Sequence, residues 1–100
     1  MISAVFNILE GKFTIQGHSG SAECGQDIIC AAVSSAAYMA VNTITEILGQ
    51  NVSADVRDGY MKISLSGRNE AATDILRGLE LHISELAEEY PDFIRITTEV

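Results

Sequence analysis

Two side chains that could together carry out covalent catalysis lie near each other in the sequence: His18 and Cys30. The thiol belongs to the segment GQDIICAAVS at residues 25–34, which is predicted to open a long apolar helix. A thiol at a helix N-terminus lies in the partial positive charge of the unpaired backbone N–H groups, which favours the thiolate. An imidazole beside it could act as its general base. The pattern therefore indicates a cysteine nucleophile for acyl transfer.

Two polar groups on the same helix could orient this pair. Asp27, Cys30 and Ser34 fall at i, i+3 and i+7, which is one helical face. We expect Asp27 to cap the helix and to orient His18, because a carboxylate that faced the thiol alone would oppose the thiolate. Each group also has a structural interpretation. A cysteine in an apolar helix is often a small buried hydrophobe, and Ser34 can bond back to the carbonyl of Cys30.

A second cysteine leaves other chemistry open. His18, Cys24 and Cys30 are each six positions apart, so they could hold zinc with Asp27 or Glu23 as a fourth ligand. Cys24 and Cys30 could instead form a reversible disulfide. Compact zinc sites use tighter spacing and a second Cys/His pair, so we favour a loop thiol without special chemistry, and expect no metal or cofactor.

The elements that must position these groups follow from hydrophobic periodicity. Strands are predicted at 2–9, 12–18, 52–56, 61–65 and 93–100, and helices at 27–48 and 69–90. Residues 19–26 are rich in Gly, Ser and Ala and are predicted to form a flexible loop that could close as a lid. Phe13 alternates with His18 along the second strand, which places them on opposite faces. The resulting order, ββαββαβ, predicts an α+β fold with a mixed, mainly antiparallel sheet.

The first helix is apolar on nearly every side, and this composition predicts that it is central and buried. It would pack on the sheet with one side and on the second helix or another subunit with the other. Met39 is accordingly expected to fill the core and His82 to be a partly buried structural residue. Tyr38 could face the site through its spacing from Ser34, but we favour a packing role for it. The second helix carries a regular apolar stripe and is predicted to be amphipathic.

Composition restricts the class of protein. One hundred residues with 47% hydrophobic content suit a single domain over residues 1–100. A net charge of −8 without clustered Lys or Arg argues against a nucleic-acid surface, and could attract a basic partner. The most apolar stretch, 28–41, is interrupted by serines and is predicted to be too short to span a membrane. No signal peptide pattern opens the chain, so we expect a reducing, cytoplasmic location.

The stretch at residues 17–34 resembles the signature of the ribosomal-processing cysteine proteases. The resemblance lies in Gly17-His18 closing a strand, the Gly- and Ser-containing loop, and GQDIICAAVS at 25–34 with the same His-to-Cys spacing. The order of elements, the chain length and the ending Tyr90-Pro91 are similar as well, so the resemblance extends over essentially the whole chain.

The resemblance implies roles for individual residues. Cys30 would be the nucleophile and His18 the general base, with Gly17, Asp27 and Ser34 in support. It also implies a homodimer whose substrate is the N-terminal extension of large-subunit ribosomal protein twenty-seven, cut after an aromatic residue. Two alternatives remain: a non-catalytic ribosome-associated binding module with the same fold, and a zinc or redox regulator that uses His18, Cys24 and Cys30.

Overall fold

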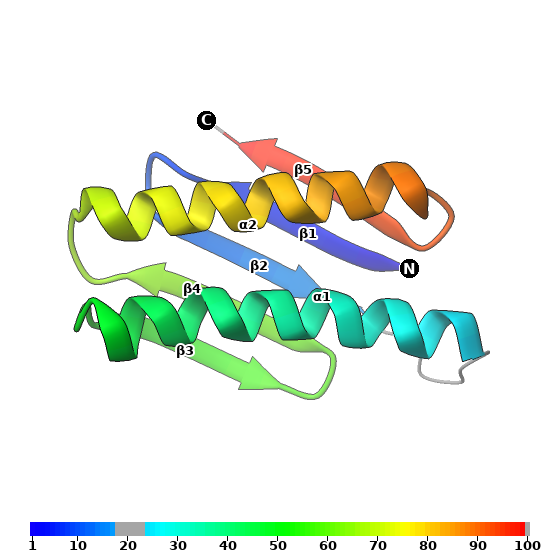
Figure 1. Ribbon diagram of the computed structural model, residues 1–100, viewed down its shortest axis with the longest axis horizontal. Coiled ribbons are helices and arrows are strands. Elements are labelled where there is room, and N and C mark those ends of the chain that lie inside the picture. Colours follow the sequence, from blue (N-terminus) through cyan, green and yellow to red (C-terminus); the bar gives the residue numbers. More distant parts are fainter. Residues whose placement is uncertain (18–23, 100) are drawn as a thin grey trace.

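One mixed sheet of five strands carries two helices across one of its faces (Figure 1). The computed structural model describes residues 1–17 and 24–99, and the side chains of 24–27 lie outside that description. The elements in chain order are β1 (Ile2–Asn7), β2 (Lys12–Gln16), α1 (Cys24–Asn42) with its continuation η1 (Thr43–Ile47), β3 (Val52–Arg57), β4 (Tyr60–Leu65), α2 (Glu70–Glu89) and β5 (Ile94–Glu99). The predicted ββαββαβ order and α+β class are confirmed.

The strand order β3-β4-β2-β1-β5 places the middle of the sheet at β2 and leaves β3 and β5 as its edges. Every neighbouring pair is antiparallel except β1 and β5, which run parallel in the register Ile2↔Ile94. The parallel pair arises because β5 returns through α2 rather than through a hairpin. The sheet is therefore mixed and mainly antiparallel, as predicted.

The core lies between the sheet and the helices. Strand alternation sends one set of side chains toward α1 and α2, and the rings of Phe6 and Phe13 stack there with centroids 5.4 Å apart. Each helix contributes one buried stripe. The buried residues of the helices are Ile29, Val33, Ala37, Ala40 and Ile44 in α1 and η1, and Ala72, Leu76, Leu79 and Ile83 in α2.

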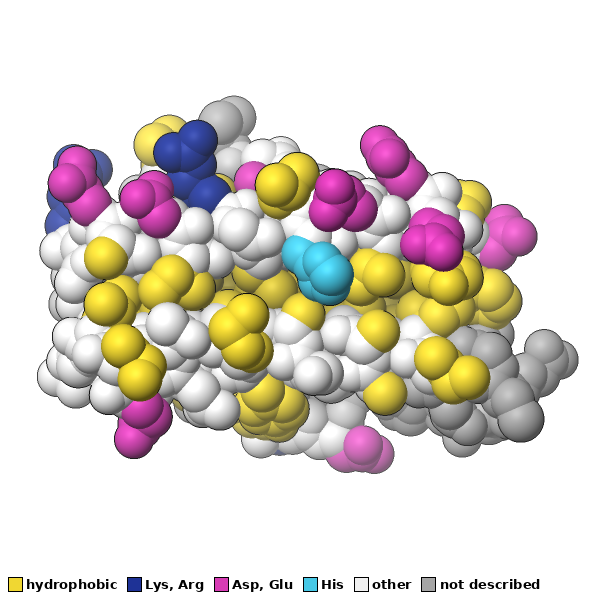
Figure 2. All heavy atoms as spheres, in the orientation of Figure 1, with side chains coloured by type: hydrophobic (Ala, Val, Ile, Leu, Met, Phe, Trp, Pro, Cys, Tyr) yellow, Lys and Arg dark blue, Asp and Glu magenta, His cyan; other side chains and the backbone are white. Residues whose placement is uncertain are grey.

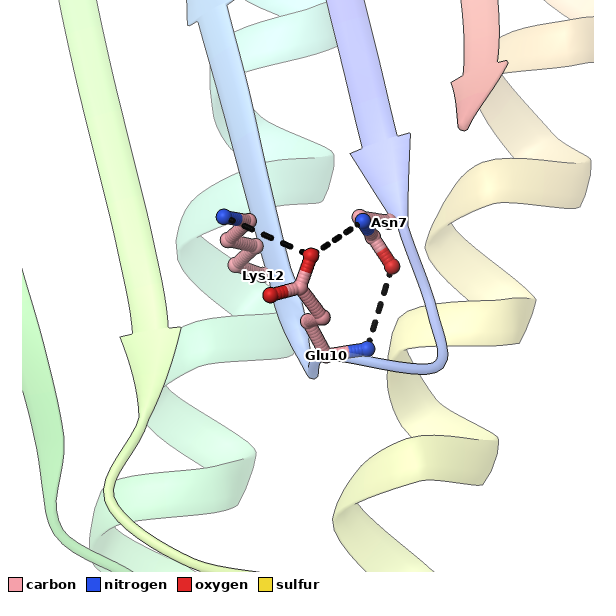
Figure 3. A network of polar contacts seen from close by, with 3 residues as sticks. All are labelled: Asn7, Glu10 and Lys12. Carbon is pink, nitrogen blue, oxygen red and sulfur yellow. Dashed lines mark hydrogen bonds and ion pairs between the residues drawn. The ribbon is translucent and has the colours of Figure 1, made fainter. Parts of the chain in front are cut away.

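A polar network closes the turn between β1 and β2 (Figure 3). Asn7 is buried, and its amide donates to a carboxylate oxygen of Glu10 at 2.7 Å while its carbonyl accepts from the backbone N–H of Glu10 at 3.0 Å. Lys12 lies 3.7 Å from the same carboxylate. All polar atoms of the buried Asn7 amide thus have partners, which removes the cost of burying them.

The first helix begins earlier than predicted. It starts at Cys24, so Asp27 lies within the helix and cannot be its N-cap residue, and the predicted loop 19–26 is correspondingly shorter. At the other end the chain widens to a π-helix over Thr43–Ile47, where Leu48 N–H donates to the carbonyl of Thr43 at 3.0 Å. The hydroxyls of Thr43 and Thr45 bond to carbonyl oxygens one turn earlier, a contact that perturbs regular helix.

The first helix is also less buried than its composition predicts. Ile28 is 70% exposed and Met39 is 66% exposed, so the expectations of all-round burial and of a core role for Met39 are wrong. The apolar stretch continues past residue 41, and over Ile28–Ile47, with mean hydropathy 1.5, it is long and apolar enough to cross a membrane by length and composition alone, a test that a core helix also passes. Its inward stripe nevertheless belongs to the core that it shares with the sheet.

The second helix matches its prediction closely. Asn69 caps it by accepting a hydrogen bond from the backbone N–H of Ala72 at 3.1 Å, and Tyr90 and Pro91 follow its last residue. His82 is exposed on this helix, so the expectation of a partly buried structural histidine is wrong.

Candidate active site

An open cleft of about 590 Å³ lies between α1 and the hairpin that joins β3 to β4. Cys30, Ser34 and Tyr38 line it from α1, residues 56–61 line it from the hairpin, and Ile15 and Gly17 line it from the end of β2. In Figure 1 the hairpin and the end of β2 lie beside the middle of α1. The fold thus brings three of the predicted site residues, Gly17, Cys30 and Ser34, to one place.

Cys30 is half-buried and is a free thiol, with one side against the core and the other toward the cleft. Ser34 follows one turn later on the same face and is exposed. Because α1 begins at Cys24, the thiol stands in the second turn rather than the first. The partial charge of a helix terminus acts within the first turn, so the argument that this charge favours the thiolate does not apply here.

Gly17 fixes the point at which the chain leaves the sheet toward His18. Its φ is +93°, and a Cβ at this position would overlap the carbonyl oxygen of Met1. Its N–H donates to the carbonyl of Gly59 at the tip of the hairpin, at 2.9 Å. Strand β2 ends at Gln16, so the alternation that begins at Phe13 stops before His18 and does not determine which face its imidazole occupies.

The remaining predicted groups lie outside the described residues. These are His18 and the loop 19–23, and the side chains of Cys24 and Asp27. The predicted His18–Cys30 pair, the orienting role of Asp27, and the zinc and disulfide alternatives all depend on these groups and stay predictions. Within residues 1–17 and 28–99, no three His, Cys, Asp or Glu side chains form a group that could hold a metal ion.

The hairpin of β3 and β4 also carries side-chain contacts on the face of the sheet that points away from the helices. Val56 pairs with Met61, which is buried beneath the helices, so alternation places Arg57 and Tyr60 on the other face. There the guanidinium of Arg57 lies 4.3 Å from the centre of the Tyr60 ring and 3.2 Å from the carboxylate of Asp55. The Arg57–Tyr60 contact joins β3 to β4 beside the tip that forms the rim of the cleft, whereas the Arg57–Asp55 ion pair lies within β3.

Most of the cleft lining was not among the predicted site residues. Tyr38 is 47% exposed and lines the cleft, so the packing role that we favoured for it is wrong. The alternative, that its spacing from Ser34 turns it toward the site, matches the structure. Val56 is 44% exposed, and no sequence signal identifies it, since alternation does not distinguish an edge strand from a central one.

A half-buried thiol at the wall of an open, peptide-sized cleft, on a small α+β fold, is the arrangement of a thiol-dependent hydrolase. The family model of cysteine protease Prp matches residues 1–95, and this chain therefore belongs to the Prp family.

Curated relatives agree with this assignment. The ribosomal processing cysteine protease Prp of Bacillus subtilis is 30% identical over 96 residues, which cover 89% of this chain and 86% of the relative. The protein of the same name from Staphylococcus aureus is 31% identical over 93 residues, with 87% and 88% coverage. The prediction of a cysteine protease is confirmed at the level of the family.

Solved structures share the fold. The structure of SMU.848 from Streptococcus mutans has a TM-score of 0.82 at 35% identity and covers 99% of this chain and 96% of its own. The Staphylococcus aureus processing protease Prp, solved with a covalently linked product peptide, has a TM-score of 0.88 at 24% identity, with 99% and 100% coverage. At that identity the second likeness supports the fold alone.

Proposed function

We propose that this protease removes the N-terminal extension of large-subunit ribosomal protein twenty-seven during ribosome maturation, with Cys30 as nucleophile and His18 as general base. The observation that carries the proposal is the position of the Cys30 thiol, half-buried on the wall of an open cleft of about 590 Å³. The names of the relatives, ribosomal processing cysteine proteases, support the substrate class.

In the proposed mechanism His18 takes the proton of the Cys30 thiol, and the sulfur attacks the scissile carbonyl carbon. The resulting tetrahedral intermediate collapses to a thioester as the peptide C–N bond breaks, and His18 gives its proton to the leaving amine. His18 then takes a proton from water, which attacks the thioester and releases the acid and the thiol. Ser34 and Asp27 act as positioning residues, and Gly17 fixes the start of the segment that carries His18.

The direct test uses a synthetic peptide that spans the start of ribosomal protein twenty-seven from the same genome. Intact-mass measurement should show one cut by the wild-type protein and at least about a 10³-fold slower reaction with Cys30→Ala. Ser66→Ala, at an exposed serine between β4 and α2 that lines neither the cleft nor the groove between α1 and α2, is the control and should cut normally. Unchanged cleavage by Cys30→Ala would refute the proposal. Binding of the peptide without any cleavage by the wild-type protein would instead support the binding-module alternative.

We also propose that two copies of the chain associate through the helical face. A groove of about 650 Å³ runs between α1 and α2, lined by small and apolar residues that include Ala32, Ala36, Met39 and Gly78. Figure 2 shows hydrophobic side chains gathered along the line between the two helices. Small side chains permit close approach of another helix, and the exposed Ile28 and Met39 would be buried by it. The homodimer implied by the family resemblance therefore has a surface that suits it.

Sedimentation of Met39→Glu tests this association. A carboxylate placed in the groove should weaken self-association at least tenfold, because a buried unpaired charge is costly. Leu9→Glu is the control, since Leu9 is 74% exposed, lies in the β1–β2 turn and changes the net charge equally. Equal sedimentation of both variants and the wild type would contradict the proposed interface.

We further propose that residues 1–100 act as one protease domain in the cytoplasm, without a metal, cofactor, nucleic-acid or membrane partner. The single core to which both helices and strands β1, β2, β4 and β5 contribute supports the one-domain assignment. The ribosomal role named for the relatives supports the location, because ribosomal proteins are made there.

A further inference from the structure

The cleft continues along α1 past the thiol. Tyr38 lies eight residues after Cys30 and on the same helical face, so the rise of an α-helix places it about 12 Å farther along the axis. Its side chain is 47% exposed and lines the cleft. An aromatic ring at this distance from a nucleophile is too remote to touch the reacting atoms.

The opposite wall belongs to the uncovered edge of the sheet. Val56 points to the helix-facing side of β3, yet it is 44% exposed because α1 does not extend over this edge strand. Ala37 and Met61 are buried and line the same cleft below. Tyr38, Val56, Ala37 and Met61 thus define an apolar notch, and we use that name for these four residues.

The wall opposite Tyr38 is tied to the rest of the sheet by backbone pairing. Val56 pairs with Met61 between β3 and β4, and on the far face of this hairpin the Arg57 guanidinium lies 4.3 Å from the centre of the Tyr60 ring. The backbone of Gly17 also bonds to the hairpin tip at Gly59. A preformed wall lowers the cost of ordering a binding site when a ligand arrives.

Building on the proposed protease function, we infer that the apolar notch is a specificity pocket for the substrate. It receives an apolar side chain three or four residues from the bond that Cys30 attacks. The spacing follows because an extended peptide advances about 3.3 Å per residue, so about 12 Å corresponds to three or four residues. The notch is lined by carbon-rich side chains and so selects an apolar side chain over a charged one.

Tyr38 variants test the pocket with the leader peptide of ribosomal protein twenty-seven as probe. Tyr38→Ala should lower kcat/KM at least about tenfold, mainly through KM, whereas Tyr38→Phe should retain wild-type values because it keeps the ring. Tyr90→Ala is the matched control, a partly exposed tyrosine beyond the end of α2. The rate at which iodoacetamide labels Cys30 should be equal in all four proteins, which shows that the thiol itself is unchanged.

A second peptide set identifies the position that enters the notch. Alanine at the third or fourth residue from the cut should weaken cleavage by the wild type, and should add little to the loss in Tyr38→Ala. The inference would be overturned if the alanine peptide lowered kcat/KM by the same factor in Tyr38→Ala as in the wild type. Equal kcat/KM of Tyr38→Ala and the wild type on the unchanged peptide would also overturn it.

Binding to Cys30→Ala, measured by fluorescence anisotropy of a labelled peptide, separates the two proposals. If the wild type does not cut but adding Tyr38→Ala to Cys30→Ala weakens binding, the proposed reaction fails and the pocket stands. If the wild type cuts but the added substitution leaves binding unchanged, the pocket fails and the reaction stands.

Discussion

Both helices bury a stripe of side chains in the core, but they differ on their other faces. Each buries one stripe of aliphatic residues, with Ile44 and Leu76 both fully buried. Beyond that stripe, α2 is largely polar and carries most of its acidic residues toward solvent, as the outer flank in Figure 2 shows. The helix α1 instead exposes Ile28, Tyr38 and Met39.

This difference distinguishes the apolar residues that packing against the sheet explains from those that it does not explain. The pattern of α2 is explained largely by packing against the sheet, since its regular apolar stripe is buried and Leu81, which is 63% exposed, is the large apolar residue outside that stripe. The additional apolar residues of α1 lie on two flanks that the isolated chain leaves open. One flank holds Cys30, Ser34 and Tyr38 in the cleft, and the other lines the groove beside α2. We therefore attribute the excess hydrophobicity of α1 to function.

Alanine substitutions in the buried stripes of the two helices should lower stability by similar amounts. These are the largest effects on stability that we expect. Ile44→Ala and Leu76→Ala each remove a fully buried aliphatic side chain, so each should lower the free energy of unfolding by about 3 kcal/mol. Urea denaturation followed by circular dichroism measures both. A loss below about 1 kcal/mol for Ile44→Ala alone would show that α1 does not share the core as α2 does.

Substitutions just before the two helices should differ in whether they affect cleavage as well as stability. Gly17 precedes the segment leading to α1, and Gly17→Ala forces a positive φ and a clash with the carbonyl of Met1. The neighbouring N–H of Ile2 is bonded to Phe93 at 2.8 Å, so Met1 cannot move freely away. We expect a loss of about 2 kcal/mol in unfolding free energy together with slower cleavage of the leader peptide.

Gly49→Ala is the control for that substitution. Gly49 also has a positive φ, of +68°, but no atom lies within 4 Å of the added Cβ. It should cost about 1 kcal/mol and leave cleavage unchanged. Equal costs and equal cleavage rates for the two variants would contradict the close approach at Gly17.

The smallest expected effect concerns the entrance to α2. Asn69→Ala removes the cap that accepts from the N–H of Ala72, and should lower stability by about 1 kcal/mol. Because this end of α2 is remote from the cleft lining, kcat/KM on the leader peptide should stay at the wild-type value. A loss of cleavage in a folded Asn69→Ala protein would contradict the assignment of the functional surface to α1 rather than to the start of α2.

The sequence predicted most of the fold because alternation and helical periodicity are strong signals here. The second helix, predicted at residues 69–90, is observed at Glu70–Glu89, within one residue at each end. Apart from His82 on α2, the errors in the helices concern α1, where apolar residues on all sides remove the periodic signal. Without periodicity, neither its start at Cys24 nor its exposed flanks could be predicted.

The candidate site was predicted in part for a similar reason. Helical spacing correctly joined Cys30 to Ser34, and the Gly17 position followed from the resemblance. Tyr38 and Val56 depend on how far α1 extends over the edge of the sheet, which is a tertiary property. The role of Asp27 as a cap failed because the helix begins three residues earlier, as the structure shows.

Site-selective alkylation tests most directly whether the exposed flank of α1 holds the reactive group. The protein is treated with a limiting amount of iodoacetamide, digested and analysed by mass spectrometry, while cleavage of the leader peptide is followed in parallel. We predict that Cys30 is labelled faster than Cys24 and that activity falls at the rate of Cys30 labelling. Full activity in protein whose Cys30 is completely alkylated, or a Cys30 that resists the reagent in the folded protein, would contradict the account.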